Sequence, residues 1–211
     1  MKNHFFLLLF VLFLFSLSAQ NADITILKQI NLNRNRSADP TFRAVTNSAS
    51  PVCIGIPVIL FTHALFTKDT IEKKNALYAG ASLTMAAIIS TGLKYGIQRP
   101  RPFIKYPFIE KASSAGSPSF PSGHTSSSFA LATSLSLAYH KWYIIAPAFI
   151  WASSVAYSRM DLGVHYPSDV LAGALIGSGS SFLCYKLNKL FTKTIIDKNM
   201  GLTKLNSTFL F

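Results

Sequence analysis

Residues 75–93 read NALYAGASLTMAAIISTGL, a stretch of 19 residues without Asp, Glu, Lys or Arg. Four further stretches also lack these residues: 44–67, 112–140, 142–158 and 170–185. A helix on the surface of a soluble protein needs polar or charged residues on its outer face. The sequence therefore predicts an all-α, membrane-embedded helical bundle with about five spans, each near the lower length limit for crossing a bilayer. The predicted spans are Pro51–Phe66, Ala76–Leu93, Thr125–Tyr139, Trp142–Tyr157 and Asp169–Tyr185.

The composition excludes several other classes of protein. Of the 211 residues, 50% are hydrophobic and 13% are charged, which is too apolar for a disordered chain. The 11 Gly, 10 Pro and 2 Cys exclude collagen-like and disulfide-rich proteins. The net charge of +12 suits an anionic membrane surface, a phosphorylated substrate or nucleic acid. Because so few residues are charged, we expect no nucleic acid partner. A soluble, secreted all-α protein with a large core is the alternative to the membrane bundle.

Residues 1–20 have the parts of a secretory signal peptide. Lys2 is followed by an almost wholly apolar run from Phe5 to Leu17 and then by small residues. An uncleaved signal anchor is the alternative, and in both cases the following chain starts outside the cytoplasm. We expect residues 21–50 to form an extracytoplasmic loop or surface helix, residues 51–186 the helical-bundle domain, and residues 187–211 a cytoplasmic tail. Lys and Arg divide evenly between the two sides of this topology, so charge alone does not decide the orientation.

Polar and ionisable residues gather at three junctions between an apolar stretch and a loop, all on the outer side of the predicted membrane. The junctions read KYGIQRPRP at 94–102, PSGH at 121–124 and SRMDLGVHYPSD at 158–169. They supply three cations, Lys94, Arg101 and Arg159, and the planar fork of Arg matches phosphate oxygens. Ser122 and Gly123 open a helix, and helix N-termini bind anions. Together these residues predict a phosphate-binding site that uses no metal.

Two histidines add catalytic chemistry to this phosphate site. His165 and Asp169 are four residues apart, so one helical turn places them on the same face. A carboxylate that fixes the imidazole tautomer suits His165 as a nucleophile that attacks phosphorus. His124 then suits the general acid for the leaving alcohol, and later the base for water. Because His165 has to be neutral and His124 protonated at the start, we expect a bell-shaped pH profile.

Each of these pieces also has an ordinary structural explanation. Lys94 would be a helix-end lysine that reaches the membrane surface, and Ser122 with Gly123 would be a helix cap. His165 and Asp169 would be a local hydrogen bond. A membrane protein that binds anions without catalysis would keep the cations and would not need His165 beside Asp169. The occurrence of all three pieces in this order on one face favours an enzyme.

The spacing of these residues resembles the type 2 phosphatidic acid phosphatase superfamily, which includes bacterial class A acid phosphatases and vanadium haloperoxidases. Lys94 with Arg101-Pro102, the run 121–124, and Arg159 with His165 and Asp169 carry the resemblance. It implies an all-α bundle that hydrolyses phosphate esters or diphosphates without metal or cofactor. The family spacing selects Arg101 rather than Arg99 as a ligand, and Asp161 matches no family position, so we interpret it as a turn or surface residue. The implied roles are phosphate binding by Lys94, Arg101, Ser122, Gly123 and Arg159, with His124 as acid, His165 as nucleophile and Asp169 as its orienter.

A site at an outer membrane surface favours a lipid phosphate as the substrate. The resemblance implies lipid A, undecaprenyl diphosphate, phosphatidic acid or phosphatidylglycerophosphate, in a bacterial-type inner membrane with the active site facing the periplasm. It also implies inhibition by vanadate, which mimics five-coordinate phosphorus. A soluble periplasmic acid phosphatase is the alternative enzyme, and its helices would carry charge on one face. The sequence does not indicate an oligomeric state.

Overall fold

The computed structural model describes the backbone of residues 21–208 and the side chains of residues 21–188, and every regular element in these ranges is helical. This confirms the all-α prediction, while the predicted signal segment lies outside the described residues. Residues 21–32 are helical, and so is part of the predicted extracytoplasmic segment that follows. The further elements are η1 (Arg36–Ala38), α2 (Asp39–Asn47), α3 (Ala49–Thr67), α4 (Thr70–Ile97), α5 (Pro102–Lys105), α6 (Gly123–Tyr139), α7 (Trp142–Asp161) and α8 (Pro167–Thr208).

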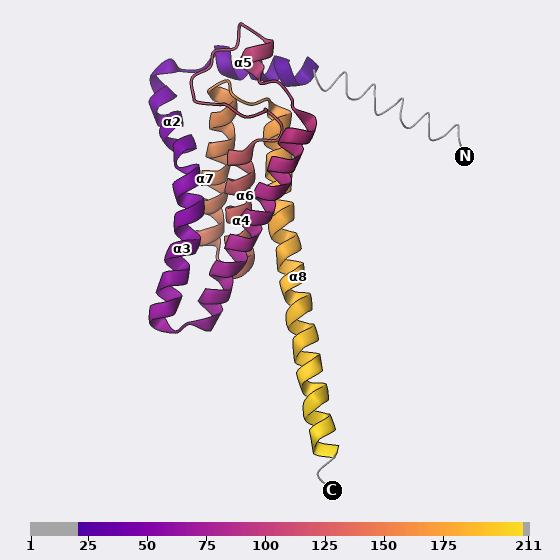
Figure 1. Ribbon diagram of the computed structural model, residues 1–211. Coiled ribbons are helices and arrows are strands. Elements are labelled where there is room, and N and C mark those ends of the chain that lie inside the picture. The colour runs from indigo at the N-terminus through magenta and orange to yellow at the C-terminus, as the bar shows by residue number, and fades with distance from the viewer. Residues whose placement is uncertain (1–20, 209–211) are drawn as a thin grey trace, which may run out of the picture.

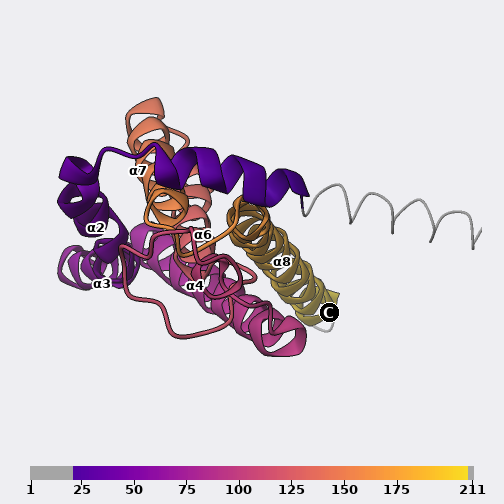
Figure 2. The same cartoon turned by 90° about the horizontal axis from the view of Figure 1, so that it is seen from above.

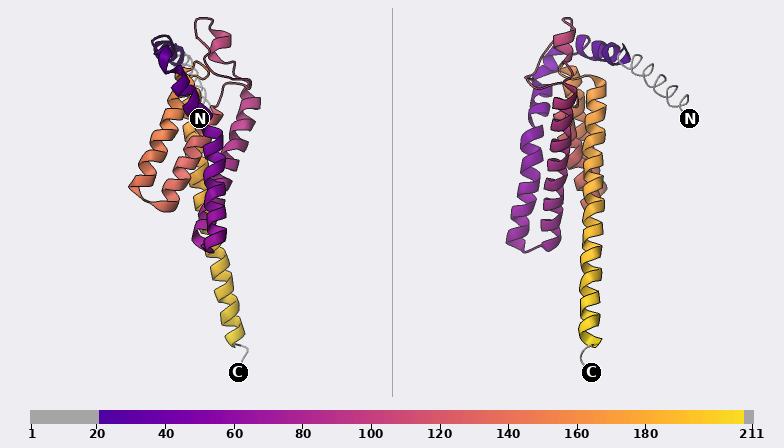
Figure 3. Two further views of the ribbon diagram at one scale, coloured as in Figure 1. Left: turned by 90° about the vertical axis from the view of Figure 1, so that its left-hand side faces the viewer. Right: turned by 45° about the vertical axis from the view of Figure 1, so that its right-hand side comes forward.

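Five long helices, α3, α4, α6, α7 and α8, run side by side as a bundle (Figure 1). Helix α6 contacts the other four and is therefore the central helix. Helix α8 continues well past the lower end of the bundle without a break (Figure 3). Each predicted span coincides with one of these helices, so the apolar stretches located the helices correctly.

Sharp turns at the lower end connect the helices in pairs. Helix α3 ends at Lys68, whose backbone is left-handed with φ 58°, and Asp69 begins α4 by accepting hydrogen bonds from the Ile71 and Glu72 amides. Helix α6 ends in the same way at His140, with φ 50°, and α7 starts at Trp142. These turns make α3–α4 and α6–α7 antiparallel neighbours. Only His140 and Lys141 separate α6 from α7, as the predicted spans Thr125–Tyr139 and Trp142–Tyr157 require.

Polarity inside the bundle is the reverse of that in a soluble protein. Large apolar side chains such as Ile59, Ile88 and Ile150 are exposed on the outer faces of α3, α4 and α7. Small polar side chains are buried between helices, where Ser90 donates to Ser126 across α4 and α6 at 2.8 Å. Without water, helices pair their polar groups with each other and turn apolar groups to lipid. This distribution supports the membrane bundle over the soluble alternative.

Three segments of the described chain are long and apolar enough to cross a membrane: 36–67, 70–105 and 167–188. They contain α3, α4 and the first part of α8. Helices α6 and α7 are not among these segments: α6 has 17 residues, and α7 has 20, with Arg159 and Asp161 in its last turn. Membrane-spanning helices are therefore present, and the number of five spans stays a prediction.

Two segments cover the upper end of the bundle: the N-terminal segment (residues 21–38) and the connector (residues 98–122). Viewed from above, the helical part of the N-terminal segment lies across the ends of the bundle helices (Figure 2). Asn31 ties the two segments together, because its side chain donates to Glu110 O at 3.0 Å and to Asp161 O at 2.8 Å. The interpretation of Asp161 as a turn or surface residue is wrong. The N-terminal segment folds over the end of α7 and leaves Asp161 only 3% exposed.

Candidate active site

The predicted site residues come together at the covered upper end of the bundle, from five separate parts of the chain. Lys94 lies near the end of α4, Arg101 in the connector, and Arg159 near the end of α7. Residues 122–124 form the start of α6, and Asp169 lies in the first turn of α8, shortly after His165 in the loop. Helices α4 and α7 end at this face of the bundle, and α6 and α8 begin there. Side chains that are far apart in the sequence therefore face one small volume.

His165 is held between a carboxylate and a guanidinium. It is 1% exposed, with Nδ1 at 3.4 Å from Asp169 Oδ2 and Nε2 at 3.3 Å from Arg101 Nη1. The carboxylate favours the tautomer that carries its proton on Nδ1. The lone pair of Nε2 then points toward the cations, where a phosphoryl group would be bound.

Asp169 is itself fixed by several donors. Its Oδ2 accepts hydrogen bonds from Ser119 Oγ at 2.5 Å and from the Tyr166 amide at 3.0 Å. Its Oδ1 accepts one from Arg99 Nη1 at 2.6 Å. The sequence identified Asp169 but not Ser119 or Arg99 as its partners. The only sequence signal for Arg99 was the repeated Arg-Pro at 99–102.

The three predicted cations surround this histidine from different elements. Arg101 donates through Nε to Ser117 O at 2.7 Å and through Nη1 to Val164 O at 2.8 Å, which fixes its guanidinium beside His165. Arg159 donates through Nη1 to Thr46 at 2.7 Å, while its buried Nε has no hydrogen-bond partner among the described residues. A buried N–H of this kind is costly unless an anion binds it.

Lys94 and the start of α6 complete the phosphate-binding surface. Lys94 Nζ donates to Pro118 O at 2.8 Å, and its Cε would lie 3.8 Å from a Cβ placed on Gly123. The first intrahelical bond runs from the Ser126 amide to Ser122 O, so the amides of Gly123 and His124 have no partner within α6. The Ser122 amide differs, because it donates to Asp169 O at 3.0 Å. Ser122 therefore joins α6 to α8 rather than offering its amide to a ligand.

Both histidines are uncharged at neutral pH. Burial lowers the pKa of His165 to about 3; Arg101 and Arg159 add to this effect and Asp169 opposes it. Burial, together with Arg159, Arg101 and Lys94, lowers the pKa of His124 to about 4. A protonated His124 at the start of the reaction was expected from the sequence. It is instead neutral, because burial first, and then the three cations, disfavour a positive charge on the ring.

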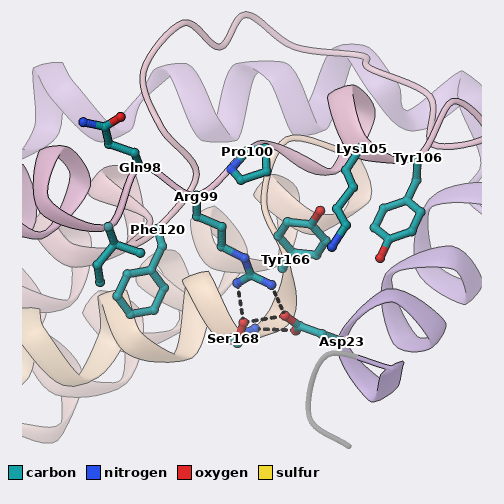
Figure 4. A pocket seen from close by; sticks show the side chains of 10 residues that line it. Asp23, Gln98, Arg99, Pro100, Lys105, Tyr106, Phe120, Tyr166 and Ser168 are labelled. Carbon is teal, nitrogen blue, oxygen red and sulfur yellow. Dashed lines mark hydrogen bonds and ion pairs between the residues drawn. The ribbon is translucent and has the colours of Figure 1, made fainter. Parts of the chain in front are cut away.

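One cavity lies at the site and another lies beside it. One, of about 340 Å³, opens between α3, α4 and α6 and is lined by Gly123, His124 and Ser127 together with apolar side chains that include Ile54 and Leu83. The other, of about 500 Å³, lies beside the connector (Figure 4). It is lined by Asp23, Ile97, Gln98, Arg99, Pro100, Lys105, Tyr106, Phe120, Tyr166 and Ser168. Among the residues with described side chains, no group of three or more His, Cys, Asp or Glu is placed to hold a metal ion.

Known proteins resemble this chain in sequence. The family model described as the PAP2 superfamily matches residues 75–193. Lipid A 4'-phosphatase of Bacteroides thetaiotaomicron is 37% identical over 78 residues, 37% of this chain and 35% of that protein. Undecaprenyl-diphosphatase BcrC of Bacillus subtilis is 30% identical over 122 residues, 58% of this chain and 62% of that protein. The chain thus spans less than two thirds of either relative.

Two solved structures resemble most of this chain. Aquifex aeolicus LpxE superposes with a TM-score of 0.70 and 27% identity, covering 78% of this chain and 95% of that one. A transmembrane PAP2-type phosphatidylglycerolphosphate phosphatase from Bacillus subtilis gives 0.70 and 26%, covering 82% and 87%.

Proposed function

The chain belongs to the PAP2 superfamily, and from this premise we propose that it is a metal-independent phosphatase of a membrane lipid phosphate or diphosphate. The reaction proceeds through a phosphohistidine on His165. The observation that carries the proposal is the placement of this imidazole, with Nδ1 facing Asp169 and Nε2 facing Arg101. A membrane anion-binding protein would not need a buried, oriented imidazole inside a group of cations.

In the first half of the reaction, Lys94, Arg101 and Arg159 hold the phosphoryl oxygens and stabilise the charge that spreads over them. The Nε2 lone pair of His165 forms a bond to phosphorus, and the bond from phosphorus to the lipid oxygen breaks. His124 gives its proton to that oxygen, which leaves as an alcohol or a phosphate. Asp169 accepts the Nδ1–H hydrogen bond and stabilises the positive imidazole of the intermediate.

In the second half, water attacks the phosphorus while His124 takes a proton from it. The bond between Nε2 and phosphorus breaks, its electron pair returns to His165, and inorganic phosphate leaves. Since the pKa of His124 is about 4, the negative phosphoryl group has to raise it before His124 acts as an acid. Substrate binding neutralises the three cations that lower this pKa.

The cavity of about 340 Å³ beside His124 supports a lipid substrate. It opens between α3 and α4, and the side chains of Ile54, Leu83 and Ala87 make much of its wall apolar. A hydrocarbon chain fits such a wall, while the phosphate on its end reaches His124. The named relatives act on lipid A and undecaprenyl diphosphate, so both belong among the candidates, with phosphatidic acid and phosphatidylglycerophosphate.

The orientation of the site follows from the sequence of residues 1–20. A signal segment starts the following chain outside the cytoplasm, and the upper end of the bundle carries the N-terminal segment. We therefore propose a bacterial-type inner membrane protein whose site faces the periplasm. Vanadate should inhibit it, because the same cations and His165 would hold five-coordinate vanadate in place of phosphorus.

A phosphate-release panel tests this function. Purified protein in detergent, with chelator present, is offered the four lipids named above and a small soluble phosphoester. We expect release from at least one lipid, loss of release in His165→Ala, and full release in His140→Asn, which lies in the turn at the opposite end of α6. Asn is a matched replacement there because it tolerates the left-handed backbone.

The same panel separates the alternatives. Equal activity of His165→Ala and wild type would refute the phosphohistidine, and binding of vanadate without any turnover would favour a non-catalytic anion-binding protein. Preference for the soluble phosphoester, with extraction from membranes by carbonate, would favour a soluble acid phosphatase.

A further inference from the structure

Asp23, in the N-terminal segment, is part of a buried polar network that reaches the candidate site. It is 6% exposed, and its Oδ1 accepts a hydrogen bond from the Ser168 amide at 2.8 Å. Its Oδ2 accepts from Ser168 Oγ at 2.5 Å and from Arg99 Nη2 at 2.7 Å. These contacts, drawn in Figure 4, attach the N-terminal segment directly to the start of α8.

Arg99 joins Asp23 to Asp169. Its Nη2 donates to Asp23, and its Nη1 donates to Asp169 Oδ1 at 2.6 Å and to Ser168 Oγ at 2.7 Å. The guanidinium lies over the Tyr166 ring, with Cζ 3.9 Å from the ring centroid. Stacking and two charged partners leave the guanidinium one orientation. Both Nη atoms of Arg99 are therefore engaged within the protein, on Asp23, Ser168 and Asp169, and do not offer a fork to a phosphate.

The orientation of Asp169 depends on this network. Its Oδ2 faces His165 Nδ1 at 3.4 Å, which is long for a hydrogen bond and too weak to fix either side chain alone. The short contact of Oδ1 with Arg99, together with Ser119 on Oδ2, sets the carboxylate plane. Asp23 in turn keeps Arg99 in place, and it lies outside the residues 75–193 that match the family model.

We propose that Asp23 and Arg99 are positioning residues for the proposed phosphohistidine reaction, acting through Asp169 on His165. This inference rests on the proposed function. In it, the N-terminal segment is part of the catalytic apparatus and not only a cover over the bundle. The region just after the signal segment would then be needed for turnover even though it does not touch the substrate.

The charges of Arg99 and Asp23 distinguish a positioning role from one in which these residues only stabilise the fold. The charged groups facing the His165–Asp169 pair are Arg99 and Arg101 from the connector, Lys94 from α4, Arg159 from α7, and Asp23 through Arg99. Removing the cation of Arg99 makes the pair bind its proton more readily. The acid limb of kcat/KM, where the pair is protonated, then moves to higher pH. Removing the anion of Asp23 does not produce that upward shift.

The experiment compares Arg99→Gln, Arg99→Lys and Asp23→Asn with wild type between pH 2.5 and 8, a window that includes the pKa of about 3 for His165, on the panel lipid that the wild type hydrolyses fastest. Arg99→Gln should lose about a hundredfold in kcat with little change in KM, as expected for a catalytic group misplaced by about 1 Å. Its acid limb should move up by about one pH unit. Arg99→Lys keeps the charge, so it should lose kcat without moving the limb.

Asp23→Asn keeps an oxygen acceptor for Ser168 and should lose about tenfold in kcat through a smaller displacement. The matched control is Arg34→Gln. It breaks two other ion pairs of the N-terminal segment, those of Arg34 with Asp39 and with Glu110, and neither involves Asp169. Thermal unfolding in the same detergent shows whether each variant is folded.

The outcomes separate the two proposals. An unmoved acid limb in folded Arg99→Gln, or a kcat loss in Arg34→Gln equal to that in Asp23→Asn, would overturn the positioning inference while the function stands. Absence of wild-type turnover on every lipid would refute the proposed function, and this inference with it.

Discussion

Helix α6 carries His124 and helix α8 carries Asp169, and Gly177 lies where these two helices approach closely. A Cβ on Gly177 would lie 2.2 Å from Ser126 O and 2.8 Å from the Ala130 amide nitrogen, both backbone atoms of α6. Backbone atoms inside a helix cannot rotate away as a flexible side chain can. In Gly177→Ala, α8 therefore has to move away from α6 by about 1 Å to restore an ordinary contact.

The size of the effect follows from what the two helices hold. Overpacking a tight helix interface costs about 1–3 kcal/mol of stability. The Ser122 amide at the start of α6 donates to Asp169 O in α8 at 3.0 Å, so the same movement separates His124 from His165 and Asp169. A misplacement of about 1 Å lowers kcat by about a hundredfold. We expect a folded, moderately destabilised protein with most of its activity lost.

Phosphate release and thermal unfolding in one detergent measure both effects. Gly179→Ala is the matched control, because no atom lies within 4 Å of its Cβ position. It should keep full activity and gain up to about 1 kcal/mol, since Ala restricts the unfolded chain more than Gly. Wild-type activity and stability in Gly177→Ala would refute the argument that close packing of α6 on α8 sets the geometry of the site.

Three further predictions use the same assays. The alkaline limb of the pH profile should lie at higher pH for kcat than for kcat/KM. His124 acts as an acid only below its pKa, and bound phosphate raises that pKa from about 4. Alkaline limbs at the same pH in the two profiles would contradict this. Arg101→Lys should lower kcat/KM by about thirtyfold, or about 2 kcal/mol, because a lysine cannot reproduce the fork that contacts Ser117, Val164 and His165; equal kinetics would show that charge alone suffices. Carbonate should leave the protein in the membrane fraction, given the exposed apolar side chains on α3, α4 and α7, and release without detergent would refute the membrane assignment.

Local spacing explains why so much of the site could be predicted. His165 and Asp169 are only four residues apart, and Ser122 and Gly123 are adjacent at a helix start, so each pair lies close together without any tertiary information. The uncharged stretches likewise locate the five long helices, because helices in lipid lack charged faces. The number of spans does not follow as directly, since α6 is short and rich in serine.

Contacts between distant segments could not be predicted. Asp23 binds Arg99, and Thr46 binds Arg159, although each pair is separated by more than 70 residues in the chain. No short motif records such a pairing. The burial of Asp161 was missed for the same reason, because it depends on Asn31 folding over the end of α7.

The protonation state of His124 also could not be predicted from the sequence. The motifs assign it the part of an acid, while its pKa depends on burial and on how closely Arg159, Arg101 and Lys94 approach it. Those distances belong to the folded bundle. Residue types and spacing thus predict which side chains form the site, while the charge state of His124 depends on how the folded chain packs around it.

Covalent labelling of His165 is the direct test of a phosphohistidine intermediate. The protein is mixed with a lipid substrate whose terminal phosphate carries ³²P, quenched in alkali within the turnover time, and digested for peptide mapping. We expect an acid-labile, alkali-stable label on the peptide that contains His165, and none in His165→Ala. Turnover without any such label, or a label on another residue, would contradict it.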